Sequence, residues 1–268
     1  ATPPPSTIIG ALGRLLGLRP DKKPPEDLHS LAQKIGEKPL LWGPIYESVE
    51  AEGADPCRAD AKNTYIQITP TALINIEEAH YVARLAQGTK LSPTLCRLVL
   101  ATRPGIWRGK ALFYTERVYY ICKKEKQSTA ERLRRVEFEK LRLVYYLNSD
   151  VGIPPTVTRL GGEGGQALVC TQEGGKPPQG SGDVGILLAP ALIKPGRDYP
   201  PWALGTYDEE SHTLKKREIY LGLGYSEVYK TRRPLLRALP PGTVVHSRDR
   251  PSHLGELAEL GYGATHWL

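Results

Sequence analysis

Histidines and paired carboxylates are the residues of this chain that could carry acid–base chemistry. The histidines lie far apart, at His29, His80, His212, His246, His253 and His266. General acid–base catalysis needs such a group beside the substrate, and by location only His246 and His266 are candidates. The Glu77-Glu78 and Glu209-Glu210 pairs are neighbours in sequence. Neighbouring side chains seldom face one site, so we interpret both pairs as solvated surface.

Motifs that announce a reaction are missing from the sequence. It has no phosphate-binding Gly-Lys-Ser/Thr pattern, no His-Glu-x-x-His and no Gly-x-Ser-x-Gly. No carboxylate cluster has the spacing of a magnesium site. We therefore expect no catalytic residue, no metal ion and no cofactor, and a protein that is not an enzyme.

The cysteines indicate a compartment. Cys57, Cys96, Cys122 and Cys170 lie too far apart in sequence for a zinc-type or redox pair. Scattered cysteines in a chain of 268 residues favour reduced core residues and a cytoplasmic location. No apolar run approaches the ~20 residues of a membrane span, and no signal peptide begins at Ala1, so no membrane partner is expected.

Binding of a polyanion is the function that the charge favours. The formal net charge is +7 and the densest basic segment is Lys230, Arg232, Arg233 and Arg237. A second basic set, Arg103, Arg108, Lys110 and Arg117, alternates with Trp107, Tyr114 and Tyr119. Cations interleaved with aromatic rings suit backbone contacts and base stacking, although an ordinary exposed hairpin or solvated edge has the same composition.

Glycines point to a second binding element. Arg159 precedes the run Gly161-Gly162-Glu163-Gly164-Gly165, which follows a predicted helix and precedes a strand. Such a loop lets a bound backbone approach peptide N–H groups closely. Glu163 would accept a hydrogen bond from a base or fix the loop to the protein. Ser6 or Thr7 caps a helix to about Leu16, whose Gly10, Gly13 and Gly17 predict close backbone packing, or a helix N-terminus aimed at a phosphate.

The order of predicted elements gives the fold class. We expect further helices from residue 24 to 36, 75 to 86, 130 to 148 and 254 to 260. Strands are expected at 39–49, 65–69, 98–121 (as a hairpin), 166–171, 184–193, 218–223 and up to 245. This predicts an α+β fold of two ferredoxin-like (RRM-like) halves with an inserted hairpin and loops, the first strand lying before Ala1.

Composition shifts divide the chain in two. We expect an N-terminal ferredoxin-like domain over residues 1–171, which carries the glycine loop. Residues 172–183 are rich in Gly, Pro and Ser and are predicted to form a linker or surface loop. Residues 184–268 form a second, less regular α+β half.

Four motifs, in order, resemble the RAMP subunits of CRISPR effector complexes. They are the opening helix from Pro5 to Leu12, Gly105-Ile106 with the stretch from Ala111 to Glu116, Leu160 to Gly164, and the stretch from Arg233 to Thr243. The last resembles the third Cmr subunit of type III-B complexes. Residues 121–144 and 172–183 match nothing in that pattern.

The resemblance implies a function in antiviral defence. Such subunits bind the repeat-derived 5′ tag of the CRISPR RNA without cleaving it. They dock on the large polymerase/cyclase subunit and on backbone RAMP subunits, and meet target RNA indirectly. The residues implied in RNA binding are Ser6, Thr7, Arg159, Gly161, Gly162, Glu163, Gly164, Gly165, Lys230, Arg232, Arg233 and Arg237.

Three alternatives remain. One is a RAMP-family endoribonuclease that processes CRISPR RNA, with a catalytic histidine or a Tyr–Lys pair near the glycine loop, where Tyr145 and Tyr146 are close in sequence. Another is the equivalent subunit of a different type III complex. The third is a scaffold whose basic segments bind acidic proteins.

Overall fold

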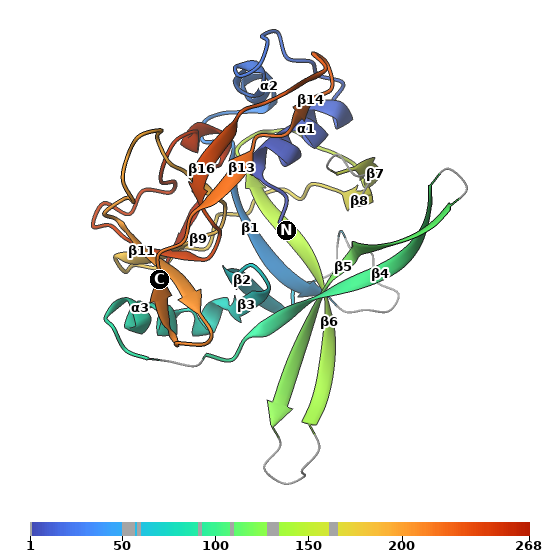
Figure 1. Ribbon diagram of the computed structural model, residues 1–268. Helices are drawn as coiled ribbons and strands as arrows, with labels where there is room; N and C mark the ends of the chain where they lie inside the picture. Colours follow the sequence, from blue (N-terminus) through green and yellow to red (C-terminus); the bar gives the residue numbers. More distant parts are fainter. Residues whose placement is uncertain are drawn as a thin grey trace.

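The fold is mixed α+β, with few helices and mostly antiparallel sheets (Figure 1), as the sequence predicts, and it is consistent with ferredoxin-like halves. The computed structural model describes residues 2–49, 57, 60–90, 93–107, 110–127, 134–160 and 166–268. Between residues 99 and 140 it describes the course of the backbone only.

Two helices open the chain and pack on each other. Helix α1 spans Pro5–Leu15 and α2 spans Asp27–Ile35, close to the predicted ranges. A Cβ at Gly13 would lie 2.7 Å from the Cδ2 atom of Leu31 on α2, so this glycine packs closely, but against a side chain and not against a backbone as predicted. Gly10 faces open space instead, and Gly17 follows the end of α1 with φ +65°.

Six strands follow and close into a barrel, each pairing antiparallel with its neighbour in sequence. The last, β6, returns to β1, and Leu41 lies opposite Leu147. Figure 1 shows the long strands β4 and β5 extending beyond the barrel. The strands are β1 (Leu41–Val49), β2 (Asn63–Thr69), β3 (Ala72–Asn75), β4 (Cys96–Trp107), β5 (Lys110–Gln127) and β6 (Arg134–Leu147).

The helix predicted over residues 130–148 is wrong. The described part of that range is β6, which pairs with both β1 and β5. Its sequence contains a period of two, with Val136 and Phe138 and then Leu141 and Leu143 separated by charged residues. β-branched and aromatic residues favour a pleated surface, and two neighbouring strands supply partners for the backbone. The helical spacing was the weaker of two patterns in one segment.

Between β3 and β4 a short helical segment covers the barrel, as predicted. It consists of η1 (Ile76–Glu78) and α3 (His80–Ala86). The Asn75 side chain accepts a hydrogen bond from the Glu77 N–H at 2.9 Å and caps the first turn. Val82 and Leu85 point into the core.

The C-terminal half is built of small sheets. One has the order β12-β11-β17-β9-β18 and another the order β10-β16-β13. The predicted helix near the C-terminus is reduced to the short segment η2. Bounds are β9 (Val184–Leu187), β10 (Ala191–Leu192), β11 (Ala203–Asp208), β12 (Thr213–Lys215), β13 (Ile219–Gly222), β14 (Tyr225–Ser226), β15 (Thr231–Arg232), β16 (Leu235–Leu239), β17 (Thr243–His246), η2 (Ala258–Leu260) and β18 (Thr265–Trp267).

One core crosses the predicted domain boundary. Ile66 and Ile74 of the barrel belong to the same buried cluster as Ile186, Val244 and Ala264. The predicted linker, residues 172–183, packs against the last strand. There the Gln179 Nε2 donates to the Thr265 carbonyl at 3.1 Å, and the Gly182 N–H donates to the Leu268 carbonyl at 2.6 Å. The predicted boundaries stay predictions, but the halves share a hydrophobic interior.

A buried ion pair fastens the C-terminal half to α2. The Arg233 side chain is 11% exposed and that of Asp27 is 0% exposed. The Arg233 Nε and Nη2 donate to the Asp27 carboxylate at distances of 2.6–3.0 Å. The Nη1 of the same guanidinium donates to the carbonyls of Leu223 and Tyr225. One side chain thus holds β13 and β14 against α2.

We predict that Arg233→Ala lowers the free energy of unfolding by about 3–5 kcal/mol, because it leaves the buried Asp27 carboxylate unpaired. Arg232→Ala, next to it in sequence but exposed, is the matched control and should change stability by less than about 0.5 kcal/mol. Urea denaturation measures both. Equal effects of the two substitutions would contradict the assignment.

Two buried histidines predict sensitivity to acid. Burial lowers the pKa of His253 and of His266 below the ordinary 6.5. Each ring donates to a backbone carbonyl, at 2.7 Å to Leu41 and at 2.8 Å to Pro178. Below pH 6.5 the unfolded chain therefore binds protons that the folded chain does not. Stability contributed by these groups is complete above that pH and is lost as the pH falls.

The expected result is a free energy of unfolding that decreases between about pH 7.5 and about pH 5. His266→Gln should reduce this dependence, whereas His246→Gln, which alters an exposed ring, should not. Urea titrations at the two pH values compare the variants. A pH dependence that is the same in His266→Gln and the wild type would exclude the role of this histidine.

Candidate nucleic-acid interface

The hairpin that presents the glycine loop is small and exposed. It consists of β7 (Thr156–Arg159) and β8 (Gln166–Val169), with Arg159 opposite Gln166 at its end. The glycine loop, residues 161–165, lies outside the described residues, so its contact with RNA stays a prediction. Arg159 is exposed at the edge of that loop. An isolated two-stranded hairpin is marginally stable in water, so its attachment matters.

A disulfide attaches the hairpin at its base, and two hydrogen bonds close that base. Cys170 is bonded to Cys57 in the connection between β1 and β2, 113 residues away in sequence. Just after it, the Thr171 Oγ1 accepts a hydrogen bond from the Ile153 N–H at 2.8 Å. The Thr171 N–H donates to the Ile153 carbonyl at 3.2 Å. The two hydrogen bonds join the segments on either side of the hairpin, and the disulfide links the hairpin to the connection between β1 and β2.

The prediction of reduced cysteines is wrong. Cys57 and Cys170 are joined, and Cys96 is also disulfide-bonded. Sequence spacing could not reveal a pairing that the fold creates between distant segments. The cysteines therefore give no support to the predicted cytoplasmic location. Among the described residues no helix is long and apolar enough to cross a membrane.

The opening helix places its two predicted RNA ligands differently. Ser6 is 4% exposed, and its hydroxyl lies beside that of Tyr262, whose pKa is raised by burial. Thr7, the next residue, is half-buried. Ser6 therefore belongs to the packing of α1 on the C-terminal half, and only Thr7 of the two reaches solvent.

The basic segment divides into two anchored and two exposed side chains. Arg233 forms an ion pair with Asp27. Arg237 donates to both carboxylate oxygens of Glu218, at 2.7–3.0 Å. That carboxylate raises the Arg237 pKa. Lys230 and Arg232 are exposed, and neither has an ion-pair partner among the described residues. The geometry leaves Lys230 and Arg232 as the cations that this segment can offer to a phosphate.

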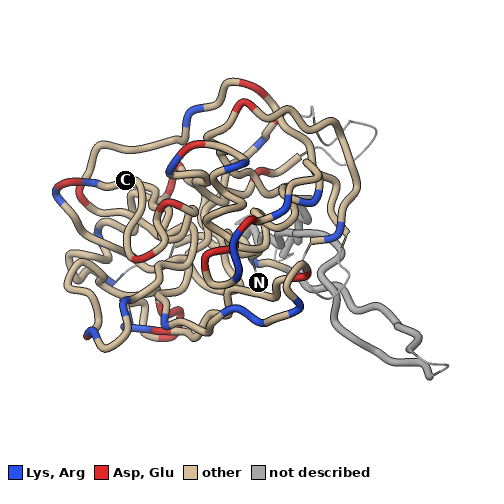
Figure 2. The backbone as a smooth tube through the Cα atoms, turned by 90° about the horizontal axis from the view of Figure 1, so that it is seen from above, with Lys and Arg blue, Asp and Glu red and all other residues tan. Residues whose placement is uncertain are grey.

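Charges elsewhere are mixed. Figure 2 shows positions of Lys and Arg interspersed with positions of Asp and Glu along the described backbone. Asp208 illustrates the local pairing: it is 6% exposed and contacts both Lys215 and Arg217. Hydrogen bonds from the Ser211 N–H, from Lys215 and from the Ser211 hydroxyl hold the pKa of this carboxyl well below its usual range.

The candidate catalytic histidines have structural surroundings. His266 is 5% exposed and lies edge-on to Trp42, with ring centroids 6.4 Å apart. His246 is exposed and its Nε2 lies 3.0 Å from the Asp183 carboxylate. Within the described part of the chain, no group of three histidines, cysteines or carboxylates could hold a metal ion. The glycine loop and these histidines come from different elements.

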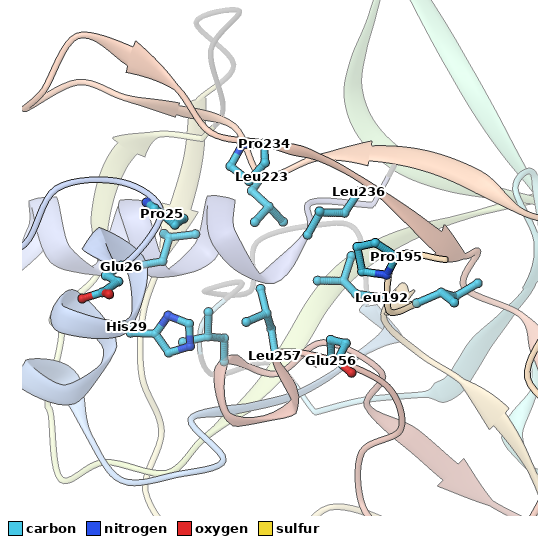
Figure 3. A pocket seen from close by; sticks show the side chains of 13 residues that line it. Pro25, Glu26, His29, Leu192, Pro195, Leu223, Pro234, Leu236, Glu256 and Leu257 are labelled. Carbon is cyan, nitrogen blue, oxygen red and sulfur yellow. The ribbon is translucent and has the colours of Figure 1, made fainter. Parts of the chain in front are cut away.

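An apolar pocket of about 270 Å³ lies between α2, the β13–β16 sheet and η2. Figure 3 shows Leu223 and Leu236 pointing into it from the sheet and His29 lying at its α2 side. His29 contacts the Glu259 carboxylate through its Nε2. The lining is mainly leucine and proline, and its polar members are Glu26, His29 and Glu256.

Comparison with known proteins identifies the fold. No protein-family model matches the chain, and no curated protein matches it. Two of the solved structures that are similar to this chain come from one type of complex. One is a chain of the type III-B Cmr-beta complex bound to cognate target RNA and AMPPnP, state 1, with 16% identity and a TM-score of 0.59 over 92% of this chain and 78% of that one. The other is a chain of Cmr-beta bound to cognate target RNA, with 15% identity and a TM-score of 0.60 over 98% and 85%. This chain therefore has the fold of chains found in Cmr-beta complexes.

Sequence reasoning missed one exposed feature. Tyr220 is 73% exposed and Leu235 is 64% exposed, on the sheet that carries the basic segment. The sequence could have predicted the exposure of Tyr220. It lies between Ile219 and Leu221 in a predicted strand, so its side chain points to the face opposite theirs.

The disulfide at the base of the hairpin gives a local prediction. In Cys57→Ser/Cys170→Ser, we expect trypsin to cleave after Arg159 several times faster, because the hairpin loses its covalent attachment, and stability to fall by about 2–4 kcal/mol. Cleavage after Arg232 is the internal control and should be unchanged. Mass spectrometry of timed digests measures both rates. Unaltered cleavage after Arg159 would show that packing alone holds the hairpin.

Proposed function

We propose that this chain is a non-catalytic RNA-binding subunit of a type III-B CRISPR effector complex, equivalent to the third Cmr subunit. The observation that carries the proposal is the fold similarity, which extends over 92–98% of the chain. Both similar structures are complexes bound to target RNA. The four sequence motifs, met in the same order along the chain, point to the same class independently.

In this proposal the ligand is the repeat-derived 5′ tag of the CRISPR RNA. The hairpin β7–β8 presents the glycine loop, and Arg159, Lys230 and Arg232 supply positive charge at the surface. Positioning RNA needs backbone N–H groups and cations rather than reactive groups. The protein partners are the large polymerase/cyclase subunit and backbone RAMP subunits, with target RNA met indirectly.

The absence of turnover is also part of the proposal. His266 is buried against Trp42 and His246 is paired with Asp183, so neither ring stands free beside an RNA path. An endoribonuclease of the same superfamily and the equivalent subunit of another type III complex are the competing assignments. Repeat RNA incubated with the purified chain separates the first, because a nuclease would shorten it.

Binding to RNA should depend steeply on salt. We predict that Lys230→Ala/Arg232→Ala makes the negative slope of log affinity against log salt concentration less steep. The magnitude of the slope should fall by about 0.7 for each single-strand phosphate that the two cations neutralise in the wild type. The control removes two exposed lysines elsewhere, in Lys22→Ala/Lys90→Ala, and should leave the slope unchanged.

Fluorescence anisotropy with labelled repeat RNA, over a series of salt concentrations, measures the slopes. If the wild-type chain shows no salt-dependent affinity for RNA, the RNA-binding function is excluded, and a scaffold for acidic proteins becomes the better account.

A further inference from the structure

Exposed apolar side chains gather on one ribbon of the C-terminal half. Of the seven large hydrophobic residues that are exposed in the described part of the chain, four lie between residues 220 and 235. They are Tyr220 (73% exposed), Leu235 (64%), Val228 (51%) and Tyr225 (49%). Such a gathering on a soluble surface marks a contact site rather than scattered chance exposure.

The ribbon is continuous although it includes two small sheets. The Leu223 N–H donates to the Pro234 carbonyl at 3.1 Å, and the Arg233 N–H donates to the Gly224 carbonyl at 2.9 Å. These bonds join the pair β13–β16 to the pair β14–β15 in one register, and Figure 1 shows β13 and β16 running side by side. The residues that lie opposite each other are Tyr220 and Arg237, Gly222 and Leu235, and Tyr225 and Arg232.

One face of the ribbon is covered and the other is open. Leu223 and Leu236 point into the pocket beside α2 (Figure 3). Because side chains alternate along a strand, Tyr220, Gly222 and Leu235 project to the opposite side, where they are exposed.

Gly224 changes the phase of this alternation. Its φ is +86°, a conformation that glycine adopts without steric cost. Beyond it Ser226 is 2% exposed and Arg233 turns inward to Asp27. Tyr225 and Arg232 consequently emerge on the open side, together with Tyr220. The two tyrosines lie in different strands, Tyr220 in β13 and Tyr225 in β14, so they would contact two different groups of a ligand.

The charges of the ribbon favour an anionic ligand. Its carboxylates are already neutralised, since Glu218 pairs with Arg237 and Glu227 pairs with Arg14. Lys230 and Arg232 remain exposed, without an ion-pair partner among the described residues. Rings with free cations beside them match the bases and phosphates of a single strand.

We propose that this open face is a stacking platform for unpaired RNA bases. Tyr220 and Tyr225 each stack on one base, and Arg232 and Lys230 contact the phosphates. Gly222 keeps the space over Leu235 clear, since a Cβ there would meet only Leu235, at 3.9 Å. The inference rests on the proposed RNA-binding function. It adds which part of the RNA the protein contacts, namely the flat faces of unpaired bases, which do not depend on the base sequence.

The test uses the full chain and two fluorescein-labelled probes of equal length and charge, oligoadenylate and the same backbone with abasic sites. Tyr220→Ala should weaken oligoadenylate binding between about fivefold and about a hundredfold, which is the loss of one stacked base. Tyr220→Phe keeps the ring and should change it less than about twofold. Gly222→Val should also weaken binding. Tyr81→Ala, which removes an exposed tyrosine on α3 (37% exposed), should have no effect.

On the abasic probe the wild type and Tyr220→Ala should bind equally, because no base is left to stack. If all variants bind oligoadenylate like the wild type, the platform is excluded while the proposed function stands. If the wild type binds neither probe, the platform is excluded, and the proposed function is excluded with it only if the wild type also fails to bind labelled repeat RNA. If Tyr220→Ala keeps its RNA affinity but loses a partner subunit on assembly of the complex, the face is a protein interface and the inference is wrong.

Discussion

The ion pair between Arg233 and Asp27 is the interaction on which the position of the exposed ribbon, residues 219–237, depends. Its carboxylate is fully buried, so the guanidinium has to compensate for the loss of water around it. It does this with charge-assisted bonds to both oxygens, the strong form of such a pair. The same guanidinium also satisfies two carbonyls of the ribbon. The ribbon, whose strand β16 also pairs with β10, is thereby fixed against α2.

This constraint decides which face of the ribbon meets solvent. With Arg233 directed inward, Leu223 and Leu236 close over the α2 side, and the exposed tyrosines and cations are left outside. Four basic residues in eight positions therefore have separate tasks. Arg233 and Arg237 hold the protein together through Asp27 and Glu218, whereas Lys230 and Arg232 remain available. Counting positive charge in the sequence overstates the cations that a ligand could contact.

Much of the fold could be predicted from local pattern. Helices α1 and α2, the segment that ends at Ala86 and the hairpin β4–β5 follow from periodicity and turn residues. The predicted cap at Ser6 or Thr7 is wrong, since Pro4 is the N-cap residue of α1 and no side chain caps the helix. Strand β6 could not be predicted in this way, because its residues fit both a helical period and the period of two of a strand. The strand forms because β1 and β5 lie on either side of it and supply hydrogen-bond partners. The pairing of Cys57 with Cys170 is likewise produced by tertiary structure. So is the burial of Ser6, which looks like an exposed cap until Tyr262 is placed beside it. Site prediction was limited for the same reason, since cations look alike until their partners are known.

The central claim is that the chain works inside a CRISPR ribonucleoprotein and binds its guide RNA. Affinity purification of the tagged protein from its native cell, with sequencing of the RNA and identification of the proteins recovered, tests this most directly. The account predicts RNAs whose 5′ ends share one repeat-derived sequence, together with a large polymerase/cyclase subunit and backbone subunits. Recovery of the protein without RNA, or with RNAs that share no common 5′ sequence, would contradict it.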